Sequence, residues 1–215
     1  MYQIFKEGNK YSILLENSNE SLIKSITKTK IILGSTITNN YTVMSFHANS
    51  VQTLKEYYKV GRVSYDICMK LIYYLSIQLK YLIETCNKAF VGYSPEHIIV
   101  INNERFVYMN VNQLRNINHN ECIDIRYPFS HEDFYMSPEH RNIDEIPTNI
   151  HYKACYYSLA CLIIHGYSNK PYDLNNLNNN INHKLELLPI KDTKLYYLLK
   201  RCITEDIQNR CILYI

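Results

Sequence analysis

The start of the chain alternates apolar and polar positions with the two-residue period of β-strands. Four short runs, each bounded by turn-forming residues, predict two pairs of strands: Tyr2–Phe5 with Lys10–Leu15, and Lys30–Thr38 with Tyr41–Phe46. The turns are expected at Glu7-Gly8-Asn9 and at Asn39-Asn40, because Gly and Asn tolerate the backbone angles that hairpin turns require. A short helix over Glu20–Thr27 is expected between the two pairs.

Helical spacing replaces this pattern after Ser50. Val51–Tyr58 predicts a short helix, and Gly61 is expected to end it. Ser64 is the predicted N-cap of a long helix over Tyr65–Cys86. The apolar residues of this second helix form one stripe, which is typical of a helix that packs against a core on one face.

The middle of the chain combines a hairpin signal with a long polar stretch. Ile98–Ile101 and Arg105–Met109 predict two strands around Asn102-Asn103. Val111–Ile150 shows little periodicity and is predicted to be a loop. A loop of this length in a compact domain is usually functional or conceals an unrecognised element.

The last third is predicted to be helical. Lys153–His165 is apolar nearly all round, so a buried helix is expected there, with Gly166 just past its end. Asn175–Asn182 is an Asn-rich, low-complexity loop. A final helix is expected over Thr193–Ile203, with Asp192 as its N-cap. Strand pairs followed mainly by helices predict an α+β fold with segregated parts.

Composition and charge exclude several classes of function. The 215 residues are 47% hydrophobic, which is enough for one sizeable core or for a small lobe packed on a larger one. A net charge of +3 is too weak to indicate nucleic acid or a membrane surface as the partner. The chain has no apolar run long enough to span a bilayer and no signal-peptide pattern, so a cytoplasmic protein is expected.

The cysteines indicate neither disulfides nor zinc. All seven are scattered, and none belongs to a C-x-x-C pair. His131-Glu132-Asp133 groups possible metal ligands, but it lacks the spacing that places two ligands on one helical face, so a solvated loop is expected. The enrichment in Asn, Ile, Lys and Tyr suits an A/T-rich genome, such as that of a virus, a parasite or an endosymbiont.

Several segments, taken in order, resemble landmarks of the protein kinase superfamily. Tyr41–Phe46 is similar to the fifth strand and hinge, with Met44 in the gatekeeper position and Ser45 and Phe46 after it. Phe90–His97 falls on the H-R-D-x-K-P-x-N signature, where Pro95 matches. The remaining landmarks, which are D-F-G, A-P-E and the segment whose arginine pairs with the A-P-E glutamate, fall on Asn110-Val111-Asn112, Ser137-Pro138-Glu139 and Asp206–Arg210.

This resemblance implies a kinase-like α+β fold with a reduced, β-rich N-terminal lobe over residues 1–46 and a larger, mainly helical lobe over residues 47–215. It further implies a buried, bidentate ion pair between Glu139 and Arg210, because the planar guanidinium matches a carboxylate. A large A/T-rich DNA virus is an expected source of such a chain.

The groups that perform phosphoryl transfer in a kinase are missing at the matching positions. Gly92 stands in place of the catalytic aspartate, and His97 and Asn110 stand in place of the two groups that hold metal. The chain has no glycine-rich loop, and a leucine or isoleucine of Ser12–Leu15 occupies the place of the nucleotide-binding lysine. Lys10, like Lys24, is a nearby alternative that is more typical of a solvated surface.

The resemblance therefore implies a pseudokinase, which would act through protein–protein interaction as a scaffold, decoy or regulator. Its expected partner is another protein, with a kinase or a kinase substrate as candidates. No metal or other cofactor is expected, and ATP binding is not expected. Two alternatives stay open, namely a degenerate but active serine/threonine-kinase-like phosphotransferase and a structural or virion component.

Overall fold

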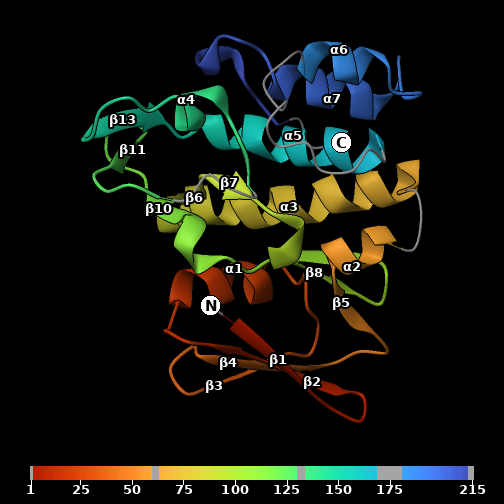
Figure 1. Ribbon diagram of the computed structural model, residues 1–215. Coiled ribbons are helices and arrows are strands. Elements are labelled where there is room, and N and C mark those ends of the chain that lie inside the picture. Colours follow the sequence, from red (N-terminus) through yellow and green to blue (C-terminus); the bar gives the residue numbers. More distant parts are fainter. Residues whose placement is uncertain (1, 60–62, 130–133, 169–180, 213–215) are drawn as a thin grey trace.

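The fold is a stack of layers that runs from a small sheet at one end to two short helices at the other (Figure 1). The computed structural model describes residues 2–59, 63–129, 134–168 and 181–212. The first layer is a four-stranded antiparallel sheet, in the order β1-β2-β4-β3. Its strands are β1 (Tyr2–Glu7), β2 (Lys10–Leu15), β3 (Thr36–Thr38) and β4 (Val43–His47).

One face of this sheet belongs to the core. Tyr11, Ile13 and Leu15 of β2 are buried, and the register places Tyr11 opposite Phe46 and Ile13 opposite Met44. The predicted hairpin is confirmed, with Gly8 at a φ of +58° in its turn. Alternation along β2 thus turns every second residue toward the helix that covers the sheet.

That helix is α1 (Glu20–Lys28), which lies between the sheet and α3 (Figure 1). Asn19 caps it, because the Asn19 side chain accepts a hydrogen bond from the Leu22 backbone N–H at 2.9 Å. The strand predicted over Lys30–Thr38 is wrong for most of its length, and only Thr36–Thr38 is extended. Ile31 and Ile32 are instead buried against the core in the irregular turn after α1.

A second, three-stranded sheet lies beyond α1, in the order β5-β8-β9. It consists of β5 (Val51–Thr53), β8 (Ile98–Ile101) and β9 (Arg105–Tyr108). The hairpin of β8 and β9 is confirmed, whereas the helix predicted from Val51 is wrong in its first turn. Pairing with β8 holds Val51–Thr53 extended, so the helix α2 begins only at Leu54 and ends at Lys59.

The long helix α3 (Tyr65–Cys86) crosses the middle of the molecule. The Ser64 side chain accepts from the Ile67 backbone N–H at 3.2 Å, so the predicted N-cap is confirmed. Asn87 ends the helix in the left-handed conformation, which Asn adopts more readily than most residues. Gly61, which was expected to end the preceding helix, lies outside the described residues.

The segment predicted as one long loop, Val111–Ile150, contains several short elements. These are η2 (Val111–Gln113), β10 (Leu114–Asn116), β11 (Cys122–Ile125), β12 (Tyr135–Met136) and α4 (Pro138–Arg141), and β13 (Thr148–His151) overlaps its end. Three two-stranded pairs arise, in which β10 pairs with β6 (Lys88–Phe90), β12 with β7 (Gly92–Tyr93), and β11 with β13. Strands of two to four residues are too short to show a period, so the sequence pattern missed them.

The helix α5 (Ala154–Ser168) is buried on all sides for most of its length, as the sequence predicts. It lies between α3 and the layer formed by α6 (Ile181–Glu186) and α7 (Lys194–Cys202) (Figure 1). Gly166 does not end α5 but continues within it, where a Cβ would approach the Tyr58 hydroxyl oxygen to 2.3 Å. A side chain at this position would therefore displace the Tyr58 ring.

Two further expectations about the C-terminal part need correction. The N-cap of α7 is Thr193, whose side chain accepts from the Tyr196 backbone N–H at 3.3 Å, and Asp192 instead adopts a φ of +63°. The Asn-rich stretch lies mostly outside the described residues, but its last two residues begin α6. No helix within the described ranges is long and apolar enough to cross a membrane.

Candidate functional site

The stretch that resembles a catalytic loop folds as a strand, a tight turn and a second strand. Gly92 belongs to β7, and Ser94 caps the short helix η1 (Pro95–His97) by accepting from the Glu96 backbone N–H at 3.4 Å. Pro95 takes the first position of η1, where its missing N–H leaves no partner unsatisfied. The turn then passes directly into β8, so local capping explains its shape.

Gly92 lies in a space that other side chains already fill. A Cβ at this position would lie 2.8 Å from two side-chain atoms of Met136 and 3.3 Å from the Gln113 Oε1. The Gly92 carbonyl accepts a hydrogen bond from the Tyr108 hydroxyl at 2.8 Å. An aspartate at this position would therefore require the Met136 side chain to move.

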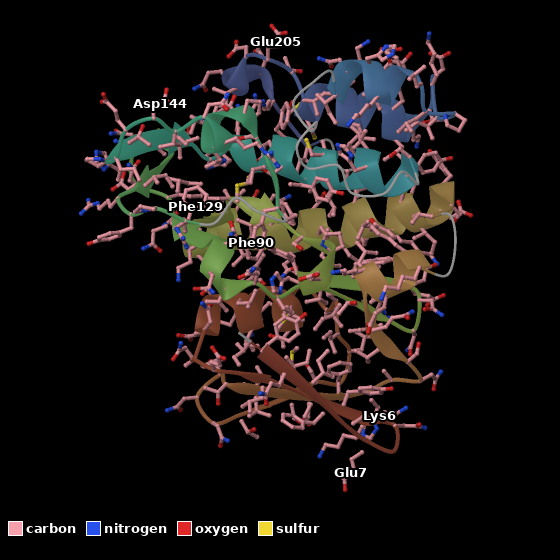
Figure 2. All side chains as sticks on the ribbon, in the orientation of Figure 1. Lys6, Glu7, Phe90, Phe129, Asp144 and Glu205 are labelled. Atoms are coloured by element: carbon pink, nitrogen blue, oxygen red, sulfur yellow. The ribbon has the colours of Figure 1, made fainter. Side chains whose placement is uncertain are left out.

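His97 and Asn110 line one cavity of ≈ 510 Å³. Tyr2, Phe129 and Phe134 provide aromatic walls, and Arg115 adds a charged group. Phe129, labelled in Figure 2, lies on the side of the molecule where β6 and β10 run. The structure thus brings together two of the three positions at which the sequence predicted lost chemistry.

Neither of these two side chains is arranged as a metal ligand. The His97 ring stacks on Phe134 with centroids 6.0 Å apart, and burial lowers the pKa of His97. The Asn110 Oδ1 accepts from the Asn112 backbone N–H at 2.9 Å and so caps η2. No Asp or Glu is among the described residues that line the cavity.

The predicted hinge residues lie away from this cavity, within β4. Met44 and Phe46 are buried, and the Phe46 ring stacks on Tyr11 with centroids 6.2 Å apart. The Ser45 hydroxyl shares a hydrogen bond with the Ser12 hydroxyl at 2.8 Å. None of the described lining residues belongs to the predicted hinge. The side chains of the hinge residues instead make contacts within the sheet.

No lysine of β2 reaches this cavity within the described part of the chain. Ile13 and Leu15 are buried in the sheet, and the side chain of Leu14 is exposed on the opposite face. Lys10 is exposed at the start of the strand, and Lys24 forms an ion pair with Glu20 on α1. The lysines therefore occupy the solvated positions that the sequence favoured for them.

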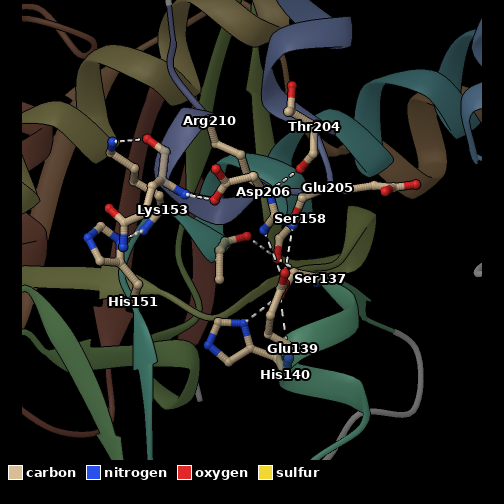
Figure 3. A network of polar contacts seen from close by, with 12 residues as sticks. Ser137, Glu139, His140, His151, Lys153, Ser158, Thr204, Glu205, Asp206 and Arg210 are labelled. Atoms are coloured by element: carbon tan, nitrogen blue, oxygen red, sulfur yellow. Dashed lines mark hydrogen bonds and ion pairs between the residues drawn. The ribbon is translucent and has the colours of Figure 1, made fainter.

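Glu139 and Arg210 form the bidentate ion pair that the resemblance implies (Figure 3). The Arg210 Nη1 donates to the Glu139 Oε2 at 3.0 Å, and Nη2 donates to Oε1 at 2.6 Å. Arg210 is 1% exposed and also donates through Nε to the Thr204 carbonyl at 2.8 Å. Its guanidinium lies 4.9 Å from the centre of the Tyr157 ring.

This ion pair joins the start of α4 to the segment after α7. Burial by itself raises the pKa of Glu139, but the hydrogen bonds and charge of Arg210, together with hydrogen bonds from the Glu139 backbone and from Ser137, outweigh it, so the pKa lies below its usual value. The carboxylate is therefore charged at neutral pH, as the pairing requires. The contact ties two segments that are far apart in the sequence.

Two further buried side chains, those of Ser158 and Ser137, form hydrogen bonds in the same region. The Ser158 hydroxyl of α5 donates to the Val91 carbonyl at 3.1 Å and accepts from the Ser137 backbone N–H at 3.0 Å. Ser137 itself is fully buried and caps α4, which leaves it no access to a substrate.

His140 is fully buried, which no pattern in the sequence indicates. Its Nδ1 lies 3.0 Å from the Ser137 hydroxyl oxygen, and its Nε2 has no hydrogen-bond partner among the described residues. Burial lowers the pKa of His140 to about 4, so the ring is neutral at physiological pH. No family model matches the chain, and a search of curated proteins finds no match.

Proposed function

We propose that the chain is a catalytically inactive, kinase-like protein that acts in the cytoplasm by binding another protein, as a scaffold, decoy or regulator. The observation that carries this proposal is the filled space around Gly92. Phosphoryl transfer by a kinase needs a carboxylate that orients the attacking hydroxyl. Met136 and Gln113 occupy the volume that such a side chain would need.

The other positions that match reacting groups of a kinase also support an inactive protein. Asn110 is a neutral side chain whose oxygen already accepts a backbone hydrogen bond, whereas magnesium favours carboxylate oxygens. The described lining of the cavity contains no carboxylate and no lysine. Phosphoryl transfer relies on positioned charge, so the loss of all these groups removes most of the stabilisation of the transition state.

The order of elements supports the kinase-like part of the proposal. A small antiparallel sheet with one helix precedes the long helix α3, and a strand–turn–strand segment follows it. The S-P-E turn then precedes the buried helix α5. The ion pair between Glu139 and Arg210 supports the match of the C-terminal third, because it was inferred from the resemblance alone.

A nucleotide titration tests the proposal. We expect ATP, with or without magnesium or manganese, to leave the melting temperature unchanged, and we expect no transfer of labelled phosphate to protein substrates. A metal-dependent rise in the melting temperature, together with phosphate transfer, would instead favour the active phosphotransferase. The same titration on Asn110→Asp is a matched control. This variant supplies a carboxylate for metal, so it tests whether the assay can detect weak binding of nucleotide and metal.

The interaction part of the proposal needs a separate measurement. Affinity purification from the native cell, followed by mass spectrometry, is expected to recover a protein partner at a fixed ratio, with kinases and kinase substrates as the first candidates. A chain that is recovered only in assembled particles would favour the structural or virion component.

A further inference from the structure

Among its described lining residues, the cavity beside η1 and η2 has one guanidinium, and no described carboxylate pairs with it. Arg115 is half-buried at its wall, and its Nη1 donates to the Asn112 carbonyl at 2.7 Å and to the Leu114 carbonyl at 3.2 Å. The guanidinium carbon lies 5.9 Å from the centre of the Phe129 ring. These contacts fix the plane of the guanidinium while the donors on Nε and Nη2 meet no partner among the described residues.

The described residues around Arg115 do not compensate its charge. No salt bridge joins it to a carboxylate of the described chain, and burial lowers the pKa of its guanidinium. His97 adds no positive charge at neutral pH, because burial lowers the pKa of this ring below its usual value. A partly desolvated cation without a counter-ion is unfavourable, so an anion that enters the cavity gains a strong interaction.

The rest of the wall suits a flat, apolar group. Tyr2, Phe129 and Phe134 line the cavity with aromatic rings. Its volume of ≈ 510 Å³ lies within the range of roughly 300–1,000 Å³ that is typical of ligand sites. Apolar walls with one charged group fix both the position and the orientation of a small ligand.

We propose that this cavity binds an aromatic monocarboxylate, with the carboxylate on the Nε and Nη2 edge of Arg115 and the ring between the aromatic side chains. Arg115 is the one charged group among the described lining residues, so it balances one negative charge, and its planar fork matches a carboxylate. The triphosphate of a nucleotide carries several negative charges, and the described lining includes none of the hinge residues Met44–Phe46.

This inference does not depend on the proposed function, because a cavity of this kind can bind a ligand whether or not the chain transfers phosphate. The carboxylate can belong to a free acid or to the C-terminus of a protein that ends in an aromatic residue. Both sources present the same chemistry to Arg115, and the experiment separates them.

Calorimetric titration of the full chain with phenylacetate and with its neutral analogue phenylacetamide tests the site. We expect the acid to bind at least about tenfold more tightly than the amide, because a charge-assisted hydrogen bond is worth more than one factor of ten. Arg115→Gln should remove this preference. The matched control Arg126→Gln, which alters an exposed arginine paired with Asp124, should keep it.

Peptides that end in phenylalanine separate the two sources. A peptide with a free C-terminal carboxylate that binds more tightly than phenylacetate, and whose amidated form does not bind, points to a chain terminus as the ligand. Tighter binding of phenylacetate points to a free acid.

The proposal is overturned if the wild-type chain binds neither compound or binds acid and amide equally well. It is also overturned if folded Arg115→Gln keeps the preference for the acid. If Arg115→Gln fails to fold, the wild-type chain still tests the site. Its preference for the acid over the amide should weaken as salt is added, because salt screens the charge of Arg115.

Discussion

Replacing Arg210 with alanine would leave the Glu139 carboxylate half-buried without its partner. The substitution also removes the donors to the Thr204 and Glu205 carbonyls and the contact with the Tyr157 ring. Breaking a buried ion pair by the loss of one partner typically costs about 3–5 kcal/mol. Because the Glu139 side chain is 30% exposed and can regain water, we expect the lower end, about 3 kcal/mol.

Urea unfolding followed by circular dichroism measures this loss. With a slope of about 1–3 kcal/mol per molar of urea, the midpoint should fall by roughly 1–3 M. Arg210→Lys keeps the charge but loses the fork, so its loss should be intermediate. Arg201→Ala, at an exposed position of α7, is the matched control and should change stability by less than about 0.5 kcal/mol.

The reasoning about this ion pair fails if Arg210→Ala unfolds at the same urea concentration as Arg201→Ala. A double-mutant cycle with Glu139→Gln then isolates the pairwise part, which should lie between about 0.5 and 3 kcal/mol. A coupling near zero would mean that Arg210 stabilises the fold only through its carbonyl and ring contacts.

Three further substitutions test the packing around the candidate site. Gly92→Ala should cost about 1–3 kcal/mol, because its Cβ would meet Met136 at 2.8 Å. Ser158→Ala should cost about 1–3 kcal/mol, since it leaves two buried backbone groups without their partner. His140 has a pKa of about 4 in the fold, below its unfolded value of 6.5, so the unfolded state binds more protons and wild-type stability should fall as the pH drops from about 6.5 toward 4. His140→Gln should make this decline shallower.

Each of these predictions has its own control. Combining Gly92→Ala with Met136→Ala should cost less than the sum of the two single changes, because the smaller side chain makes room for the Cβ. Ser168→Ala alters a serine at the end of α5 and should have little effect. The exposed His119→Gln should leave the pH dependence unchanged, and an identical decline in His140→Gln would contradict the assigned cause.

Much of the helical and hairpin structure could be predicted because its causes are local. Ser64 caps α3 through a hydrogen bond to a residue three positions away, and Gly8 allows the turn of the first hairpin. The continuous apolar character of α5 is visible in the sequence and requires burial on all sides. In each case the residues that produce the signal are close together in the sequence.

The missed elements depend on partners that are distant in the sequence. Val51–Thr53 has helical spacing but is held extended by β8, and β12 exists because it pairs with β7. The strands of residues 111–150 are too short for a period to identify them. Pairing with distant strands therefore overrode the local preference at Val51–Thr53. It also formed short strands that local propensity did not predict.

The candidate site divides in the same way. Residue identity alone shows which chemical groups the kinase-like motifs lack, since Gly92 has no side chain and Asn110 has no charge, and the order of the motifs implied that Glu139 meets Arg210. The folded chain was needed to show that Met136 fills the space at Gly92, that His140 is buried, and that Arg115 faces a cavity whose described lining contains no carboxylate. Side-chain identity is a local property, whereas burial and free volume arise from residues that only the folded chain brings together.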